Sequence, residues 1–561
     1  MNCPSRNDDV EGHPDWNQSP PNFAADTTTR QDLNGIANSR SHRHHERGGT
    51  AAFRDDVFVP ERDALRSKAE AEPRAQAIGS RLASNSSAPP ARGTKLGGLG
   101  GSVEQVVQVL RKYAKFIGPG FMVSVAYIDP GNYSTDVSAG AAYKFKLLFV
   151  VLMSNIFAIF LQSLCIKLGT VTGLNLAEHC KKNCPKWLNI ILYIFAEAAI
   201  IATDIAEVIG SAISLNLLFK IPLVAGCAIT LVDVLVILFF YRPTGSLRSI
   251  RLFEYFVMAL VLGVVVCFCI QLSYIQNTTA GEVFRGYLPS SSIVEAQGLY
   301  MSCGILGATV MPHSLYLGSG IVQSRVRDFD LKLGNTDPTA LEESDSLGLS
   351  KYRPSLAAIK YCLSYSIAEL AISLFSFALF VNSAILIVAG ASLSDNADAQ
   401  SADLFGIHEL LSRTLSPAAG TLFALALLFS GTSAGIIATI AGQMVSEGQI
   451  NWTIAPWMRR LATRTISITP SIIIAAAVGK TGLSAALNAS QVVLSVILPF
   501  VSAPLIWFTC RNRYMTVAVA EGQSIGLRNH WVTATLAVLI WAVIVVMNVA
   551  LLVLEGLGTG G

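Results

Sequence analysis

Two short segments hold residues whose chemistry conflicts with the apolar stretches around them. The first runs from Ala126 to Asn132 and places Asp129, Pro130 and Gly131 inside an apolar stretch that is long enough to cross a bilayer. A charged side chain at the centre of a membrane helix costs on the order of 3 kcal/mol, and proline cannot continue a regular helix. We therefore predict a broken membrane helix here, a feature that is tolerated where it lines a cavity.

A second interrupted apolar stretch lies in the other half of the chain. It runs from Gly307 to His313 and contains Met311 directly before Pro312. Two broken spans at corresponding positions of two halves indicate the binding site of a transporter. We predict that the two breaks face each other and hold a divalent metal ion.

The donor atoms at the two breaks indicate which ions would bind. Asp129 supplies a carboxylate, Asn132 an amide oxygen and Met311 a thioether. Unwinding would also free backbone carbonyls, and we expect those of Ala126 and Ala308 to contribute. Oxygen donors suit hard or borderline divalent ions, whereas a thioether favours softer transition metals, so the set predicts Mn²⁺ or Fe²⁺ rather than Ca²⁺ or Mg²⁺. The alternatives are core packing for Met311 and a structural ion pair or helix cap for Asp129.

The composition describes the surroundings that must position these groups. Only 14% of the 561 residues are charged and 52% are hydrophobic, whereas about 25% of residues are charged in soluble proteins. We predict an all-α polytopic membrane protein with eleven transmembrane helices. The eleven apolar stretches are 116–139, 146–169, 187–217, 221–241, 252–275, 297–322, 360–391, 417–445, 462–479, 482–508 and 530–554.

The chain divides into a polar tail and a membrane domain. Residues 1–105 are rich in Arg, Asp, Ser, Gly and Pro and hold too little apolar surface to fold alone, so we predict a disordered tail. Residues 106–561 form the predicted transporter domain. Its first ten spans divide into repeats at about 116–275 and 297–508, with an extra helix at about 530–554. Because each repeat has an odd number of spans, the second repeat enters the membrane with opposite orientation, which is the inverted-repeat arrangement.

The charges in the loops predict the orientation. The loops after spans 2, 4, 6, 8 and 10 hold 18 lysines and arginines, and the opposite set holds six. The positive-inside rule places the richer set and the N-terminus in the cytoplasm.

Three acids share one face of the third span. Glu197, Asp204 and Glu207 are spaced by seven and three residues, so they line one side of a helix. Acids inside a membrane span need a partner cation or a proton. Both a proton route and a static ion-pair network fit this pattern. The candidate cations are three arginines at the start of the ninth span, Arg459, Arg460 and Arg464.

Both breaks also match a known family. The segments Asp129-Pro130-Gly131-Asn132 and Met311-Pro312-His313 resemble the signatures of the Nramp family of proton-coupled divalent metal transporters. The resemblance extends from about residue 115 to the end of the eleventh span. It includes residues 202–207 and 490–494, and the long polar tail is similar to that of the fungal manganese and iron transporter branch.

The resemblance implies a leucine-transporter-like fold with helices 1 and 6 broken, and it implies roles for individual residues. The implied metal contacts are Asp129, Asn132, Met311, the carbonyls of Ala126 and Ala308, and Gln491 as the site occludes. The implied proton pathway leads away from Asp129 through Asp204 and Glu207, with His313, Glu197, Arg459, Arg460 and Arg464 beside it. Many relatives carry a second histidine where this chain has Gly318, which argues against any proton route that needs two histidines.

Other functions fit the sequence less well. An amino-acid symporter on the same fold would need free N–H groups for a substrate carboxylate, which Asp129 would repel. A transporter-like sensor would need an output domain, and only the polar tail is available. We expect no enzymatic activity, no resident cofactor and no nucleic-acid partner. We expect metal ions and protons as substrates, a plasma, endosomal or vacuolar membrane as the location, and trafficking or ubiquitin-ligase adaptors as partners of the tail.

Overall fold

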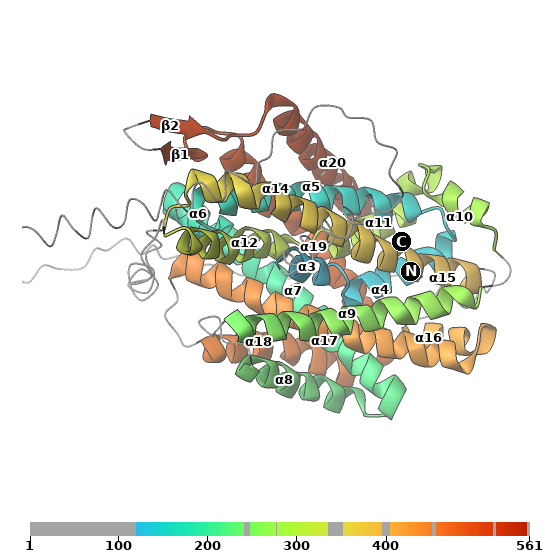
Figure 1. Ribbon diagram of the computed structural model, residues 1–561. Helices are drawn as coiled ribbons and strands as arrows, with labels where there is room; N and C mark the ends of the chain where they lie inside the picture. The colour runs from blue at the N-terminus through green and yellow to red at the C-terminus, as the bar shows by residue number, and fades with distance from the viewer. Residues whose placement is uncertain are drawn as a thin grey trace, which may run out of the picture. The chain divides into compact units, whose positions relative to one another are not determined.

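The computed structural model is built almost entirely of helices (Figure 1). It describes residues 119–240, 247–275, 278–334, 352–394, 404–451, 456–519 and 523–557. The predicted tail, residues 1–105, lies outside the described residues, so its disorder stays a prediction.

The first half of the membrane domain contains one interrupted helix followed by four long helices. They are α3 (Pro119–Val125) with α4 (Pro130–Tyr143), α5 (Leu148–Thr172), α7 (Lys186–Phe219), α8 (Leu223–Phe240) and α9 (Leu247–Ser273). The second half repeats this pattern and ends with one more helix. Its helices are α11 (Ala296–Thr309) with α12 (Pro312–Lys332), α14 (Leu356–Ser373) continued by η2 (Leu374–Ala378) and α15 (Leu379–Leu393), α17 (Pro417–Ile450), α18 (Pro456–Ala477), α19 (Lys480–Thr509) and α20 (Trp531–Gly556).

Both predicted breaks are confirmed. Helix α3 ends at Val125 and α4 begins at Pro130, while α11 ends at Thr309 and α12 begins at Pro312. Proline is favoured in the first turn of a helix, where its missing N–H is not needed. Each proline therefore starts the second half-helix, and a regular helix cannot continue through it from the first half.

The broken helices lie inside the bundle. Helix α3 contacts α14, α12 and α9, and α4 contacts α15, α11 and α19 (Figure 1). The apolar window of the segment Ala296–Lys332 is 89% buried, compared with 33% for Trp531–Leu554. The second broken span is therefore central, whereas α20 exposes most of its surface at the periphery.

The count of eleven spans is supported only in part. Each predicted stretch coincides with a helix or an interrupted helix. Among the described residues, eight helical segments are long and apolar enough to cross a membrane. The first broken span and α8 are not among the eight, and the apolar part of α18, Leu461–Ala477, is shorter. The exact number eleven therefore stays a prediction.

The prediction of a purely helical chain missed one hairpin. Strands β1 (Thr516–Val519) and β2 (Gln523–Gly526) pair antiparallel between α19 and α20, with Thr516 opposite Gly526. The loop is polar, and β1 begins with the β-branched residues Thr516 and Val517, which favour a strand. Short helices also occupy loops: α6 (Leu176–Asn183), α10 (Ala280–Gly286), η1 (Ser291–Val294) and α16 (Leu404–Thr414).

Candidate metal-binding site

Asp129 lies in the gap between α3 and α4 and is fully buried. It is the N-cap residue of α4, and its Oδ1 atom accepts hydrogen bonds from the backbone N–H of Asn132 at 3.0 Å and from the Asn132 side-chain amide at 2.7 Å. The N-terminus of a helix favours a negative charge, so the helix cap foreseen from the sequence is present. However, Oδ2 has no hydrogen-bond partner within the described residues, so one oxygen of the carboxylate remains available to a cation.

Met311 occupies the corresponding position in the second break. It is the N-cap residue of α12, it precedes Pro312, and its side chain is 1% exposed. Its carbonyl accepts bonds from the Ser314 hydroxyl at 2.7 Å and the Ser314 backbone N–H at 3.1 Å. The thioether is thus held at the break, and its contact with a metal stays a prediction.

The two prolines explain why two alanine carbonyls should be available. In a regular helix the carbonyl of residue i accepts from the N–H of residue i+4. Pro130 stands four residues after Ala126, and Pro312 stands four residues after Ala308. Because proline has no N–H, neither alanine carbonyl has its usual helical donor. The two breaks therefore share one register: alanine, two intervening residues, the donor side chain, then proline.

Asn132 connects the two breaks. Its Nδ2 atom donates to the Tyr127 carbonyl at 3.1 Å and to the Ala308 carbonyl at 3.3 Å, in addition to Asp129. Its Oδ1 atom accepts from Thr309 Oγ1 at 3.4 Å. The NH₂ group thus faces two oxygens that are predicted to bind the ion, Asp129 Oδ1 and the Ala308 carbonyl. For Asn132 to bind the ion through Oδ1, the side-chain amide must rotate.

Gln491 reaches the break from α19. It is fully buried, and a Cβ atom added to Gly131 would lie 2.3 Å from its Cδ atom. Its Nε2 atom donates to Ser490 Oγ at 2.9 Å, while Oε1 has no hydrogen-bond partner among the described residues. The amide therefore lies beside the first break, and its role as a metal contact stays a prediction.

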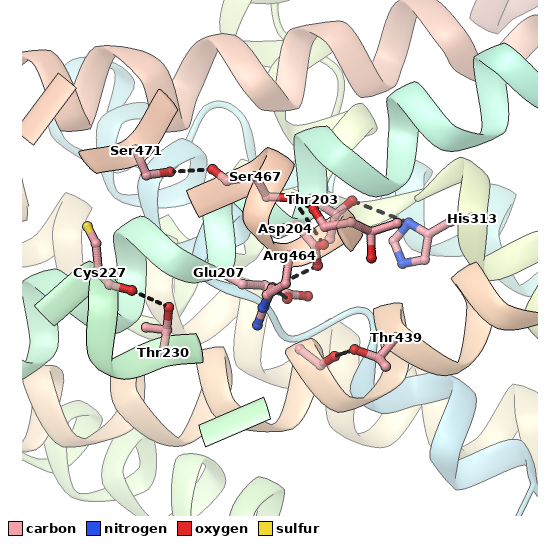
Figure 2. A network of polar contacts seen from close by, with 12 residues as sticks. Thr203, Asp204, Glu207, Cys227, Thr230, His313, Thr439, Arg464, Ser467 and Ser471 are labelled. Carbon is pink, nitrogen blue, oxygen red and sulfur yellow. Dashed lines mark hydrogen bonds and ion pairs between the residues drawn. The ribbon is translucent and has the colours of Figure 1, made fainter. Parts of the chain in front are cut away.

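The acids of the third span form a buried ion-pair cluster (Figure 2). Arg464 Nη1 lies 2.7 Å from Asp204 Oδ1 and 3.1 Å from Glu207 Oε2. Ser467, one turn after Arg464 on α18, donates to Asp204 Oδ2 at 3.2 Å. A Cβ atom on Gly435 of α17 would lie 2.9 Å from Arg464 Nη2, so the glycine leaves room for the guanidinium group. Of the three predicted arginines, the structure brings Arg464 to the acids.

Three other predicted members of the pathway lie apart from this cluster or have side chains outside the described part of the chain. Glu197 is half-buried, two helical turns before Asp204 on α7. The backbone of Arg459 and Arg460 is helical, but their side chains lie outside the described part of the chain. One of the 18 positive residues assigned to the loops from the sequence is Arg464; this assignment was wrong, because Arg464 lies within α18 and its side chain is buried.

Comparison with known proteins settles the family. The family model described as natural resistance-associated macrophage protein-like matches residues 120–554. The chain belongs to the Nramp family. It is an integral membrane protein, as that family and its apolar helices require.

Two relatives of high identity are yeast transporters. The manganese transporter SMF1 of Saccharomyces cerevisiae is 51% identical over 511 residues, which cover 82% of this chain and 88% of that protein. The iron transporter SMF3 of the same yeast is 57% identical over 418 residues, covering 74% and 86%. A crystal structure of the Eremococcus coleocola manganese transporter with an aromatic bis-isothiourea compound superposes with a TM-score of 0.64 at 31% identity, covering 77% and 85%. The predicted leucine-transporter-like fold is thereby confirmed.

His313 joins the two polar regions of this Nramp chain. It is 1% exposed at the start of α12, and its Nδ1 atom lies 3.3 Å from Thr203 Oγ1 on α7 (Figure 2). Thr203 directly precedes Asp204, so the imidazole lies between the second break and the acid cluster. This agrees with a place beside the proton route, and the role itself stays a prediction.

In this Nramp chain, the side chain of Gln162 lies beside Gly318, the position at which many relatives carry a second histidine. A Cβ atom on Gly318 would lie 2.0 Å from Gln162 Oε1. The Gln162 amide donates to Tyr127 Oη and to Ser314 Oγ, both at 2.9 Å. Gln162 thus fills the space beside position 318 and ties α5 to both broken spans. A histidine at this position would require Gln162 to move.

Several polar residues near the site of this Nramp chain were missed by the sequence reasoning. The Asn382 amide on α15 donates to the Tyr127 carbonyl at 3.3 Å and to Asn132 Oδ1 at 3.4 Å. Ser430 on α17 donates to the Ile128 carbonyl at 2.9 Å. Both residues donate hydrogen bonds to backbone carbonyl oxygens at the break, and buried polar groups generally need such partners. Their signal in the sequence was a lone amide or hydroxyl within an apolar helix, which is too common to single them out.

A second ion pair also escaped assignment. Glu369 on α14 lies 2.7 Å from Arg325 on α12, and its Oε1 atom accepts from the backbone N–H of Gly120 at 3.1 Å. This pair connects α14 with α3 and α12. Helices α3 and α12 are the halves of the two broken spans that lie toward the predicted cytoplasmic side. No specific role for Glu369 followed from the sequence, because its partner Arg325 lies on another helix, 44 residues away.

Proposed function

We propose that this protein imports divalent transition-metal ions, Mn²⁺ or Fe²⁺, into the cytoplasm together with protons. The relatives named as manganese and iron transporters support the choice of ion. The excess of positive loop charge supports a cytoplasmic N-terminus and uptake toward that side. Family membership argues for transport rather than catalysis. A plasma, endosomal or vacuolar membrane would serve equally.

The observation that carries this proposal is the buried Asp129 carboxylate at the break. One of its oxygens is satisfied by Asn132 and the other has no hydrogen-bond partner within the described residues. A buried charge in a membrane needs a compensating cation or proton. The neighbouring carbonyls of Ala126 and Ala308 lack their helical donors because of the prolines. A divalent ion could bind all three groups at once, taking the place of the Asn132 amide at the Ala308 carbonyl.

The proposed mechanism follows from this need for compensation. The ion enters from the far side and displaces a proton from Asp129, because a carboxylate must be deprotonated to bind metal. The proton moves toward Asp204 and Glu207, where Arg464 forms the ion pairs described above. The two broken spans then move relative to the rest of the bundle and open the site to the cytoplasm.

Uptake into proteoliposomes tests substrate and coupling together. The protein is reconstituted, and Mn²⁺, Fe²⁺ and Ca²⁺ uptake is measured at two external pH values. We expect Mn²⁺ and Fe²⁺ uptake that is faster at the lower external pH, and little Ca²⁺ uptake. Uptake that does not depend on an imposed proton gradient would contradict the coupling, and equal Ca²⁺ uptake would contradict the ion selectivity.

The thioether gives a prediction about selectivity. In Met311→Ala we expect partial Mn²⁺ transport to survive while Ca²⁺ begins to compete, because removing the soft ligand leaves an oxygen set that suits hard ions. The measurement is inhibition of Mn²⁺ uptake by Ca²⁺ in proteoliposomes. Met515→Ala, which truncates a fully buried methionine in the loop between α19 and β1, is the matched control. If Ca²⁺ competes no better with the variant than with the wild type, the thioether has no role in selectivity.

The close approach of Gly131 to Gln491 gives a second prediction. In Gly131→Ala the added methyl group would overlap the Gln491 amide, so either Gln491 or the break must shift. We expect a loss of Mn²⁺ uptake of at least about tenfold, equivalent to ~1.4 kcal/mol. The double variant Gly131→Ala with Gln491→Ala removes the overlap. If the single variant transports at the wild-type rate, this close packing is not needed for transport.

A further inference from the structure

A large cavity lies away from the two breaks, between α7, α19 and α20. Its volume is about 810 Å³, within the range of roughly 300–1,000 Å³ that is typical of small-molecule sites. Its walls are mainly apolar and aromatic side chains, among them Leu188, Phe195, Phe500, Trp507 and Trp541. None of the residues predicted to bind metal or carry protons lines it.

The sequence of α19 explains why the cavity exists. Pro499 and Pro504 stand inside this helix and both line the cavity. Each proline lacks the N–H of a helical hydrogen bond and carries a short ring side chain, which fills less space than a large apolar residue would. Ala503 lies between them and leaves space that a larger side chain would fill. On the other wall, the Trp541 indole N–H donates to the Pro499 carbonyl at 2.9 Å and holds α20 in place.

The cavity is at membrane level and opens to the outside of the bundle. Its lining residues Ile191, Phe500 and Trp507 are 41%, 49% and 51% exposed. Along α19 the lining extends from Val496 to Phe508, which corresponds to about 18 Å of helix. Half of the hydrocarbon core of a bilayer is about 15 Å thick. The part of the lining on α19 is therefore about as long as one leaflet is deep, and in a bilayer a hydrocarbon chain is available to fill it.

Two arginines mark the end of the cavity that faces the cytoplasm in the proposed orientation. The Arg511 guanidinium lies 3.4 Å from the centre of the Trp507 ring, and Arg513 lies 5.9 Å from the centre of the Tyr514 ring. Both rings line the cavity, and both arginines are exposed. Arginine binds phosphate in a bidentate manner, and the cytoplasmic leaflet carries the anionic lipids.

We propose that this cavity is a lipid site that holds one acyl chain of an anionic phospholipid of the cytoplasmic leaflet, with the headgroup at Arg511 and Arg513. The apolar wall, the length of one leaflet and the paired guanidinium groups each match one part of such a molecule. The choice of leaflet rests on the proposed orientation, whereas the lipid site itself does not depend on which ion is transported.

Lipid binding to the purified full-length chain tests this inference without any metal. The protein is incubated with mixed vesicles of phosphatidylserine and phosphatidylcholine, extracted in mild detergent, and its bound lipid is counted by native mass spectrometry. We expect one retained phosphatidylserine, preferred over phosphatidylcholine by at least about tenfold. In the double variant Arg511→Gln with Arg513→Gln, the preference for phosphatidylserine over phosphatidylcholine should fall. The largest expected fall is about 30-fold, which is equivalent to ~1 kcal/mol for each charge removed. In Ala503→Trp, retention of both lipids should fall.

Two matched controls keep the outcome interpretable. Leu539→Trp adds the same side chain at an exposed position of α20 outside the cavity, and Arg413→Gln removes an exposed charge from α16. Both should bind lipid as the wild type does, and melting curves should show that all variants remain folded. Equal retention by folded Ala503→Trp and wild type would overturn the proposal, as would equal binding of the two phospholipids. Because no metal is present, such a failure would leave the transport proposal untouched.

Discussion

Asp129→Asn is expected to abolish Mn²⁺ uptake and to lower the affinity for Mn²⁺ by about 100-fold, equivalent to ~2.7 kcal/mol. The substitution keeps the size of the side chain and one oxygen but removes the negative charge that compensates the ion. It also removes the group that would exchange a proton for the metal. Uptake into proteoliposomes and equilibrium Mn²⁺ binding to the purified protein measure the two effects separately.

A control distinguishes this loss from a general effect of removing charge. Glu282 on α10 is exposed and lies 3.9 Å from Lys144, so Glu282→Gln removes one acid from the predicted far side without touching the breaks. We expect this variant to take up Mn²⁺ at close to the wild-type rate. If Asp129→Asn bound Mn²⁺ as tightly as Glu282→Gln, Asp129 would be a helix cap and not a ligand.

Arg464→Gln is expected to have the largest effect on stability. The variant leaves Asp204 and Glu207 buried without the cation that now lies 2.7 Å and 3.1 Å from them. Removing one partner of a buried ion pair typically costs about 3–5 kcal/mol, because an uncompensated charge remains. We expect a lower melting temperature in detergent and a loss of proton-coupled uptake.

A compensated variant separates stability from proton transfer. The triple variant Arg464→Gln, Asp204→Asn and Glu207→Gln removes all three charges together and should regain much of the lost stability, since neutral replacements of a buried ion pair are often tolerated. If the acids carry protons, the triple variant should remain defective in coupled uptake although it is folded. Restored proton-coupled uptake would show that the cluster is only a structural ion pair.

The breaks could be predicted because their signals are local. A charge, a proline and a glycine within an apolar stretch conflict with a continuous membrane helix whatever the rest of the chain does. The sequence also predicted that Asp204 would pair with an arginine of the ninth span, because acids on one face of a membrane helix require a cation. The sequence could not distinguish Arg464 from Arg459 and Arg460, since that choice depends on how α18 packs against α7.

Other features depend on packing that no local pattern reveals. The contacts of Asn382 and Ser430 with the first break arise from helices more than 250 residues away in sequence. The position of Gln162 beside Gly318 requires α5 and α12 to pack closely, which no spacing along the chain indicates. The hairpin of β1 and β2 lies in a polar loop, where membrane hydropathy carries no information.

The claim that metal and proton share one carboxylate is tested most directly by recording both fluxes in the same proteoliposomes. Mn²⁺ entry is followed with a lumenal metal dye and proton entry with a lumenal pH dye, for wild type and Asp129→Asn. We predict that Mn²⁺ addition acidifies the lumen in the wild type and that Asp129→Asn loses both signals together. Mn²⁺ entry at the wild-type rate in Asp129→Asn would contradict the account.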